Sequence, residues 1–461
     1  MRGIFYFGFL FCCIVSISAQ TTLNGKIKVY FTKSVDTTVS KGIYAEQLLK
    51  AVDDTLVAYI NRAKFSLDIA IYNYTYASTI ADIAAAINNA YNRGVKVRII
   101  YDGSAGNTGI PKVSSFVPKL ASPQGSNYNI MHNKFVIVDA KSSNATDAIV
   151  WTGSTNWSNN MFYLDANNVV IIQDKPLALA YRTEFEEMWG DTGMIPNTTN
   201  SRFGQYKTDN TQHQFIIDGK TVELYFSPSD DANSRIINAI SKADSDLEFC
   251  MLQFTRSDIA NAIISKAQGA GFVAMGIEDP SGLLVGQTVY NNMKAVMGDS
   301  LLTDNQSNST LHHKYLIVDQ SNSMADPIVL TGSHNWTTSA NTTNDENTLI
   351  IHDSTIANIY YQEFVARFKE SGGVLSMENE VRAADATIYP NPGGAEINIS
   401  MPVNAGMKTF VKLENILGQV LFSDQIFDQV TNIDVSDYKR GMYFLKIATG
   451  TTTFVKKILL N

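Results

Sequence analysis

Strand-like and helix-like patterns alternate along the first part of the chain. Apolar residues recur every three or four positions in the helical segments and form short runs in the strand segments. The predicted order is strand 27–31, helix 44–64, strand 66–72, helix 79–93, strand 95–101, strand 169–172 and helix 176–188. Alternation of this kind is typical of an α/β fold in which helices cover a sheet.

The same order recurs in the second part of the chain. Its predicted elements are strand 222–226, helix 232–242, strand 247–252, helix 258–268, strand 272–277, strand 349–351 and helix 355–368. A polar stretch at 196–214, rich in Asn, Thr and Ser, connects the two parts. We interpret the recurrence as a duplication and predict two α/β sandwich lobes, at 26–195 and 215–372, that share one active site.

A third pattern begins near residue 385. Short alternating strands, punctuated by Gly and Pro, run to the end of the chain. This pattern is typical of a small β-sandwich, so we predict a separate C-terminal domain at 385–461.

The first 19 residues have the three regions of a secretory signal peptide. Arg2 precedes an apolar run at 4–15, and small residues follow, with Ala19 at the expected cleavage site. Two of the three cysteines lie in this segment, which leaves Cys250 alone in the mature chain. We therefore expect no internal disulfide and a buried, inert thiol at Cys250.

Composition narrows the function classes. The chain has 461 residues, of which 17% are charged and 45% hydrophobic, as in globular proteins. The formal net charge of −8 and the pI near 5.3 argue against a broad basic surface for long polyanions. A small cationic pocket remains compatible with this balance.

One motif occurs once in each half and carries most of the chemistry. The first copy contains His132, Lys134, Asp139, Ser154 and Asn156, and the second contains His312, Lys314, Asp319, Ser333 and Asn335. Residues two apart in a strand share a face, so each histidine lies beside its lysine. An ammonium binds phosphoryl oxygens, and an imidazole attacks phosphorus or moves a proton near neutral pH.

The remaining motif residues have simpler expected roles. The Gly-Ser-x-Asn turns offer hydroxyl, amide and backbone N–H groups that suit an oxyanion. Asp139 and Asp319 fall on the opposite strand face and form hydrogen bonds at the strand ends. Two histidines supply a nucleophile and an acid, so no metal or other cofactor is required. A metal site is disfavoured because a lysine accompanies each histidine and no carboxylate cluster does.

These residues resemble the two HKD motifs of the phospholipase D superfamily. The resemblance implies a bilobed α/β fold and a metal-independent phosphodiesterase that works through a phosphohistidine. It also implies that His132 and His312 are the nucleophile and the acid, in an order that the motif leaves open. The phosphate ligands would be Lys134 and Lys314, with Asn156 and Asn335 as supporting ligands. We further predict substrate contacts from Ser154, Ser333, Asp139 and Asp319.

Members of this superfamily often carry an acidic residue that orients the motif histidine. Glu346 fits that description in the second half, which favours His312 as the nucleophile. In the first half the aligned position is Ala166, with Asp165 beside it. This departure places the equivalence of the two halves in doubt.

The C-terminal region resembles the type A sorting domain of the type IX secretion system. The matching segments include residues 389–392, 416–419, 433–436 and 441–447. The resemblance implies export through the type IX machinery to the cell surface or medium, and removal of the domain. A generic adhesive or carbohydrate-binding β-sandwich is the minority alternative.

The leading interpretation is a secreted, monomeric phosphodiesterase that hydrolyses phospholipids, of phospholipase D or cardiolipin hydrolase type. Its expected partners are a phospholipid or other phosphodiester and a membrane surface. A secreted endonuclease that takes nucleic acid is the first alternative. A non-catalytic phosphate-binding surface protein, motivated by Ala166, is the second.

Overall fold

The computed structural model describes residues 23, 25–125, 128–322, 325–375, 386–401, 409–426, 430–449 and 452–461. The predicted signal peptide lies outside the described residues. Cys250 is free and buried, as predicted. Within the described part of the chain, no helix combines the length and the apolar character that crossing a bilayer requires.

The first lobe is built on a mixed eight-stranded sheet of order β2-β1-β8-β7-β6-β3-β4-β5. Its strands are β1 (Ile27–Phe31), β2 (Glu46–Gln47), β3 (Ser66–Ile71), β4 (Lys96–Tyr101), β5 (Lys119–Ala121), β6 (Lys134–Val138), β7 (Ile149–Gly153) and β8 (Asn168–Ile172). Every residue of β6, β7 and β8 is buried, which explains their near-continuous apolar sequences.

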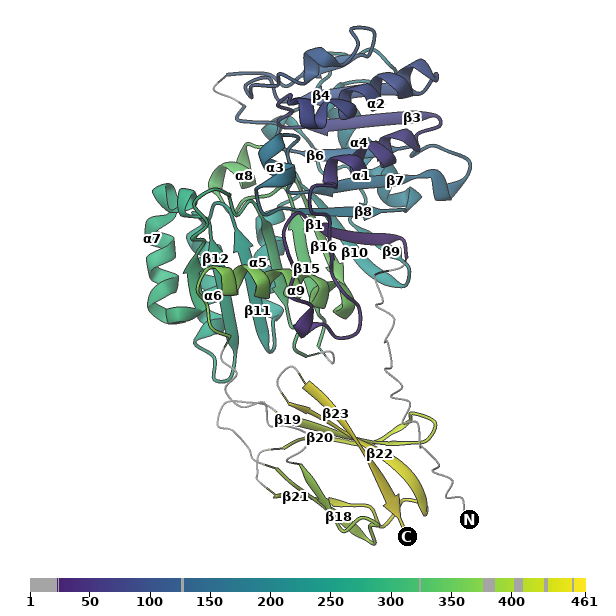
Figure 1. Cartoon of the computed structure of the whole chain (residues 1–461), viewed down its shortest axis with the longest axis vertical. Helices are drawn as coiled ribbons and strands as arrows, with labels where there is room; N and C mark the ends of the chain where they lie inside the picture. Colours follow the sequence, from purple (N-terminus) through teal and green to yellow (C-terminus); the bar gives the residue numbers. More distant parts are fainter. Residues whose placement is uncertain are drawn as a thin grey trace, which may run out of the picture.

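The second lobe repeats this arrangement in a sheet of order β13-β12-β11-β14-β15-β16-β10-β9. Its strands are β9 (Gln214–Ile217), β10 (Lys220–Ser227), β11 (Asp246–Met251), β12 (Val273–Glu278), β13 (Leu301–Thr303), β14 (Lys314–Val318), β15 (Ile328–Gly332) and β16 (Glu346–His352). The motif strands β6 and β14 occupy equivalent places, so the predicted duplication is visible in the topology. Figure 1 shows the first sheet in purple and blue and the second in green.

Helices cover both faces of the two sheets. They are α1 (Val52–Asn61), α2 (Ala81–Asn92), α3 (Asn159–Tyr163), α4 (Lys175–Trp189), α5 (Ala232–Lys242), α6 (Ser257–Ala267), α7 (Pro280–Met297), α8 (Thr338–Thr342) and α9 (Ser354–Glu370). Short 3₁₀ turns are η1 (Thr37–Val39), η2 (Ser78–Ile80), η3 (Ile110–Lys112), η4 (Ala145–Asp147), η5 (Gly204–Tyr206) and η6 (Gly298–Ser300). Helices α1 and α2 cover the outer face of the first sheet, and α5, α6 and α7 that of the second.

One hydrophobic core joins the inner faces of the two lobes. It contains Phe135 of β6, Tyr181 of α4, Tyr315 of β14 and Tyr360 of α9, together with residues from the remaining inner strands. Because the two lobes share this core, their motif strands are held in a fixed mutual position. The two predicted α/β lobes are therefore confirmed, and they pack as one body.

Two segments differ from the sequence prediction. The helix expected at 44–64 begins only at Val52, because Lys50 adopts a left-handed backbone (φ 59°) that a right-handed helix cannot contain. The chain before it instead forms β2. Helix α7 was not predicted, since its glycines at 282 and 286 weaken the helical pattern. A Cβ at either glycine would meet a backbone carbonyl oxygen of residues 252–254 within 2.3 Å, so both allow close packing.

The C-terminal region forms two small sheets, drawn in green to yellow in Figure 1. One has the order β17 (Thr387–Tyr389), β18 (Glu396–Ser400) and β21 (Val430–Asp434), and the other has the order β20 (Val420–Ile426), β19 (Thr409–Asn415), β22 (Gly441–Thr449) and β23 (Thr452–Leu460). Their inward residues, such as Ile397, Val411 and Leu445, form a separate core. The predicted small β-sandwich is confirmed.

Truncation after residue 375 should leave the two lobes folded. The core of the C-terminal region shares no residue with the core of the lobes among the described residues. Calorimetry should therefore show the main unfolding transition of the truncated chain within a few degrees of that of the full chain. A fall of about 10 °C or more, equivalent to more than about 2 kcal/mol, would show that the region supports the lobes.

Candidate active site

The two motifs are held in place by backbone bonds that cross between the lobes. The amide of His132 donates to the carbonyl oxygen of Asp345 at 2.9 Å, and the amide of His312 donates to that of Ala166, also at 2.9 Å. Each histidine precedes its motif strand by two residues. The two motif copies therefore meet at the junction of the lobes, each anchored by the other lobe.

Glu346 is the hydrogen-bond partner of His132. The Nδ1 atom of His132 lies 2.8 Å from Oε2 of Glu346, and both side chains are buried. The hydroxyl of Ser333 and the amide of Asn344 also donate to this carboxylate, at 2.6 and 3.1 Å. The prediction that Glu346 orients His312 is wrong, because the start of β16 faces the histidine of the other lobe.

Asn167 takes the corresponding place beside His312. Its Oδ1 atom lies 2.9 Å from Nδ1 of His312 and accepts a hydrogen bond from Ser154 at 2.9 Å. Its Nδ2 atom donates to the carbonyl oxygen of Met161 at 3.1 Å, which fixes the orientation of the amide. His312 therefore has a neutral partner where His132 has a carboxylate.

The predicted alignment of the two halves is wrong by one residue. Asn167 follows the motif serine of its lobe by 13 residues, as Glu346 does in the other lobe. Ala166 supplies only a backbone bond. Asp165 does not substitute for a carboxylate at His312, because its Oδ1 atom accepts from the amide of Thr310 at 2.9 Å.

The motif lysines are buried beside their histidines. Each Nζ atom donates to the backbone carbonyl of the histidine two residues before it, at 2.6 Å for both Lys134 and Lys314. Burial lowers the pKa of Lys134 to about 7. Burial and the charge of Lys134 hold the pKa of Lys314 well below its usual value. Two such ammonium groups in one buried site favour an anionic ligand.

Hydrogen bonds define the proton positions on both imidazoles. Burial opposes ionisation of Glu346, but His132 and Lys134 outweigh it and lower the pKa of Glu346 to about 2. An ionised carboxylate only accepts, so Nδ1 of His132 carries the proton and Nε2 has a lone pair. The fixed amide of Asn167 imposes the same tautomer on His312. Burial and both lysines lower the pKa of His312 well below 6.5.

Each Gly-Ser-x-Asn turn supplies an asparagine without a hydrogen-bond partner at Oδ1 and a serine that supports a histidine partner. The Oδ1 atoms of Asn156 and Asn335 are buried and have no hydrogen-bond partner among the described residues. These amides are thus available to a ligand. The hydroxyls of Ser154 and Ser333 already donate to the histidine partners described above. The two serines therefore position the histidine partners, and their contact with substrate stays a prediction.

Asp139 and Asp319 lie at the far ends of the motif strands. Both have left-handed backbones, with φ of 51° and 55°. The carboxylate of Asp139 accepts from the amides of residues 64–66, and that of Asp319 from the amides of residues 244–246. They close turns and do not contact the site, so their predicted substrate contacts are wrong. Their role as strand-end hydrogen-bond formers is confirmed.

A second layer of polar residues lies behind the motifs. Asn347 donates to Asn133 at 2.9 Å, and Asn168 lies 3.3 Å from Nδ1 of His313. Nε2 of His313 is 3.0 Å from the carboxylate of Glu363. The sequence analysis missed these asparagines and Asn167. Their signal was an acidic or amide residue followed by Asn, at the same spacing after both motif serines.

Lys207, from the segment between the lobes, secures Asp345 and was also missed. Its buried Nζ atom lies 2.5 Å from Glu184 and 3.2 Å from Asp345, and it donates to the carbonyl of Ser227 at 2.7 Å. The amide of Gly204 donates to Asp345 at 2.7 Å. Burial opposes the charge of Lys207, but the two carboxylates outweigh it and raise its pKa. The lysine thus fixes the residue that anchors His132.

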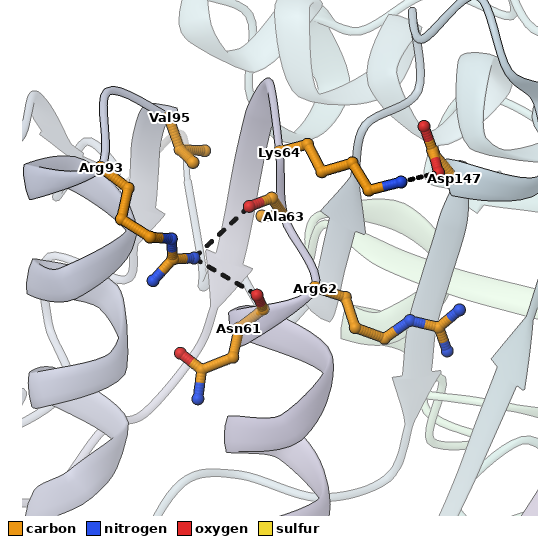
Figure 2. Close-up of a pocket in the computed structure, with 7 residues that line it drawn as sticks. All are labelled: Asn61, Arg62, Ala63, Lys64, Arg93, Val95 and Asp147. Atoms are coloured by element: carbon orange, nitrogen blue, oxygen red, sulfur yellow. Dashed lines mark hydrogen bonds and ion pairs between the residues drawn. The ribbon is translucent and has the colours of Figure 1, made fainter.

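A surface pocket of the first lobe lies away from the motifs. Its lining residues, shown in Figure 2, are Asn61, Arg62, Ala63, Lys64, Arg93, Val95 and Asp147. They lie where β3 and β4 begin, whereas Lys134 pairs with the last residue of β3. Arg93 donates to the carbonyls of Asn61 and Ala63 after α1, and Lys64 pairs with Asp147 at 2.6 Å. Arg93 thus holds the C-terminal end of α1, and Lys64 ties the segment before β3 to η4.

Two family models match the chain. The model described as "Cardiolipin synthase, PLD-like domain" matches residues 56–189 and 236–368, more than half of the chain. The model described as "Secretion system C-terminal sorting domain" matches residues 387–461. Both matches confirm the resemblances seen in the motifs.

Individual relatives agree with these models. A mitochondrial cardiolipin hydrolase of Xenopus tropicalis is 31% identical over 137 residues, 29% of this chain and 59% of that protein. A phospholipase D of Rickettsia felis is 36% identical over 123 residues, 26% of this chain and 56% of that protein. The chain thus covers less than two thirds of these relatives.

A solved structure shares the fold. The phosphatidylserine synthase of Haemophilus influenzae has a TM-score of 0.53 at 12% identity and covers 75% of this chain and 86% of its own. At this identity the likeness concerns the fold alone.

Replacing Lys207 by Met should destabilise the junction of the lobes. Removal of one member of a buried ion pair leaves Glu184 and Asp345 uncompensated, so the free energy of unfolding should fall by about 3–5 kcal/mol. Urea denaturation measures the change. Lys220→Met, which breaks a more exposed pair with Asp353, is the matched control and should cost about 1 kcal/mol or less. Equal stability of the two variants would contradict the role of Lys207.

Proposed function

Because the chain belongs to the phospholipase D superfamily, we propose that it is a phosphodiesterase that hydrolyses phospholipids, of phospholipase D or cardiolipin hydrolase type. One observation carries the proposal. Two imidazoles and two ammonium groups from separate lobes meet in one buried site, where each imidazole is oriented by a side chain of the opposite lobe. This arrangement suits attack on one side of a phosphorus atom and protonation on the other.

We assign the nucleophile to His132. Its Nε2 atom attacks the phosphorus, a P–N bond forms and the P–O bond to the leaving group breaks. The imidazole then carries positive charge, which the ionised carboxylate of Glu346 at Nδ1 stabilises. The neutral amide of Asn167 offers His312 no such stabilisation, so the asymmetry of the partners separates the two roles.

His312 then acts as the acid and afterwards as the base. Once the anionic substrate has raised the pKa of His312 and Nε2 is protonated, His312 donates that proton to the departing oxygen. In the second step it removes a proton from a water molecule, whose oxygen attacks the phosphorus as the P–N bond breaks. His132 is released with its lone pair restored, and His312 regains its proton. The site returns to its starting state.

The lysines and the motif asparagines bind the phosphoryl oxygens in this proposal. Lys134 and Lys314 supply the positive charge, and Asn156 and Asn335 supply amide groups without other partners. No cofactor enters the proposed steps. Activity in the presence of a chelator is part of the test below.

A lipid is the preferred substrate class, and a membrane surface the preferred partner. The net charge of −8 disfavours long polyanions, and the relatives include a cardiolipin hydrolase and a phospholipase D. A nuclease is an outcome of the test below. The non-catalytic alternative was based on Ala166, but Asn167 is the residue that contacts His312, so this argument no longer applies.

Export and a monomeric state complete the proposal. The match of residues 387–461 to a sorting domain supports delivery by the type IX machinery, and the sequence of residues 1–19 supports entry into the export route. The chain would act at the cell surface or in the medium. Both motif copies belong to one chain, so a single copy suffices for the site.

Hydrolysis by the wild-type chain should depend on both histidines. Cardiolipin and phosphatidylcholine vesicles and plasmid DNA are each incubated with the protein in EDTA, and released head group and nicked plasmid are quantified. We expect lipid turnover, and a loss of at least about 1,000-fold in His132→Ala and His312→Ala. Nicked plasmid with intact lipid would favour the nuclease instead. Turnover unaffected by either variant would refute the mechanism.

Glu346→Gln tests which histidine attacks. The amide can donate to Nδ1 of His132 and move the ring proton to Nε2, so kcat should fall by about 100-fold or more. Loss of the carboxylate also removes the negative charge that raises the pKa of His132. The acidic limb of the kcat/KM profile should therefore move to lower pH. Asn167→Asp, which gives His312 a carboxylate, is the mirror control. Wild-type behaviour of Glu346→Gln would assign the nucleophile elsewhere.

A further inference from the structure

His334 differs from the other histidines of the chain. Both of its ring nitrogens are buried and lack a hydrogen-bond partner among the described residues. The remaining histidines, out of six in the sequence, each have a bonded ring nitrogen; they are His132, His213, His312, His313 and His352. A buried polar group without a partner calls for an explanation, such as a ligand that the site receives.

His334 directly precedes a residue of the site in the sequence. It is the variable residue of the second Gly-Ser-x-Asn turn, directly before Asn335, whose Oδ1 atom is also buried without a partner. The equivalent residue of the first lobe is Thr155, whose hydroxyl donates to a backbone carbonyl at 3.4 Å. At this position the first lobe thus has a side chain with a hydrogen-bond partner, and the second lobe has an imidazole without one.

The ring of His334 lies within electrostatic reach of the Glu346–His132 pair. The charges of Glu346 and His132 both act on its ring, and its own charge acts on Glu346. Burial lowers the pKa of His334 to about 4, so the ring is neutral at physiological pH. A neutral imidazole has one N–H to donate.

We propose that His334 is a third imidazole of the phosphate site, which donates its N–H to a phosphoryl oxygen of the substrate half retained on His132. The ligand class is the phosphoryl group of a diester, or of inorganic phosphate in the same place. Asn335, beside it in the turn, contributes its amide to the same group. The inference rests on the proposed function and adds a substrate contact to it.

The competing explanation is that the side chain of His334 only fills space in the core. If His334 only occupied space, an apolar ring would replace it without effect on phosphate. If it donates to the phosphoryl group, removal of the N–H weakens phosphate binding, and a side chain that retains an N–H restores part of it.

The test uses the full chain with two ligands, inorganic phosphate as an inhibitor and bis(p-nitrophenyl) phosphate as a soluble diester. His334→Phe and His334→Thr should each raise the inhibition constant of phosphate and the KM of the diester by about tenfold. His334→Asn should recover part of the loss. His352→Gln is the matched control, since His352 lies at the other end of β16, about 20 Å along the strand from Glu346, and should change neither constant.

A second measurement covers variants that fail to fold. In the wild-type chain labelled with ¹⁵N-histidine, inorganic phosphate should shift the ring nitrogen signals of His334 and leave those of His352 in place. Wild-type phosphate inhibition in His334→Phe, or His334 signals that phosphate does not move, would overturn the proposal. If the wild-type chain binds phosphate through His334 but hydrolyses no diester, the proposed function fails and this contact stands. If it hydrolyses diesters with His334→Phe unchanged, only the contact fails.

Discussion

The site depends on reciprocal contacts between the two lobes. Each motif histidine is fixed by a backbone bond to the other lobe and by a side chain from it, Glu346 for His132 and Asn167 for His312. Neither lobe alone could hold its own imidazole in this orientation. The shared core, which places the inner faces of both sheets against α4 and α9, is therefore a condition for the chemistry as well as for stability.

Divergence of the two halves gives equal motifs unequal surroundings. Beside one histidine the second lobe supplies a carboxylate, and beside the other the first lobe supplies an amide. Backbone carbonyls of Asp345 and Ala166 anchor His132 and His312, but only Asp345 is itself held by an ion pair, with Lys207. A symmetric site would leave both imidazoles with the same basicity. The differences around the motifs, and not the motifs themselves, assign the nucleophile and the acid in the proposed mechanism.

The sequence predicted the fold and the motif residues because both rest on local patterns. Hydrophobic periodicity located most strands and helices, and the repeated His-x-Lys spacing located the site. The partners of the histidines could not be predicted in this way. Spacing along a strand tells which residues share a face, but not which lobe that face meets, so Glu346 was assigned to the wrong histidine. Asn167 was missed because the first half was aligned one residue too early, so that Ala166 stood opposite Glu346.

Electrostatics explains how an acidic protein can take an anion. Burial holds the pKa values of Lys134, Lys314 and His312 below their usual ranges, so the site resists carrying its full positive charge. A bound phosphodiester would offset that cost and raise all three pKa values. Protonation of His312, which the first step requires, would then be coupled to substrate binding. The local electrostatic field of the site, and not the net charge of −8, would thus select the ligand and control when His312 is protonated.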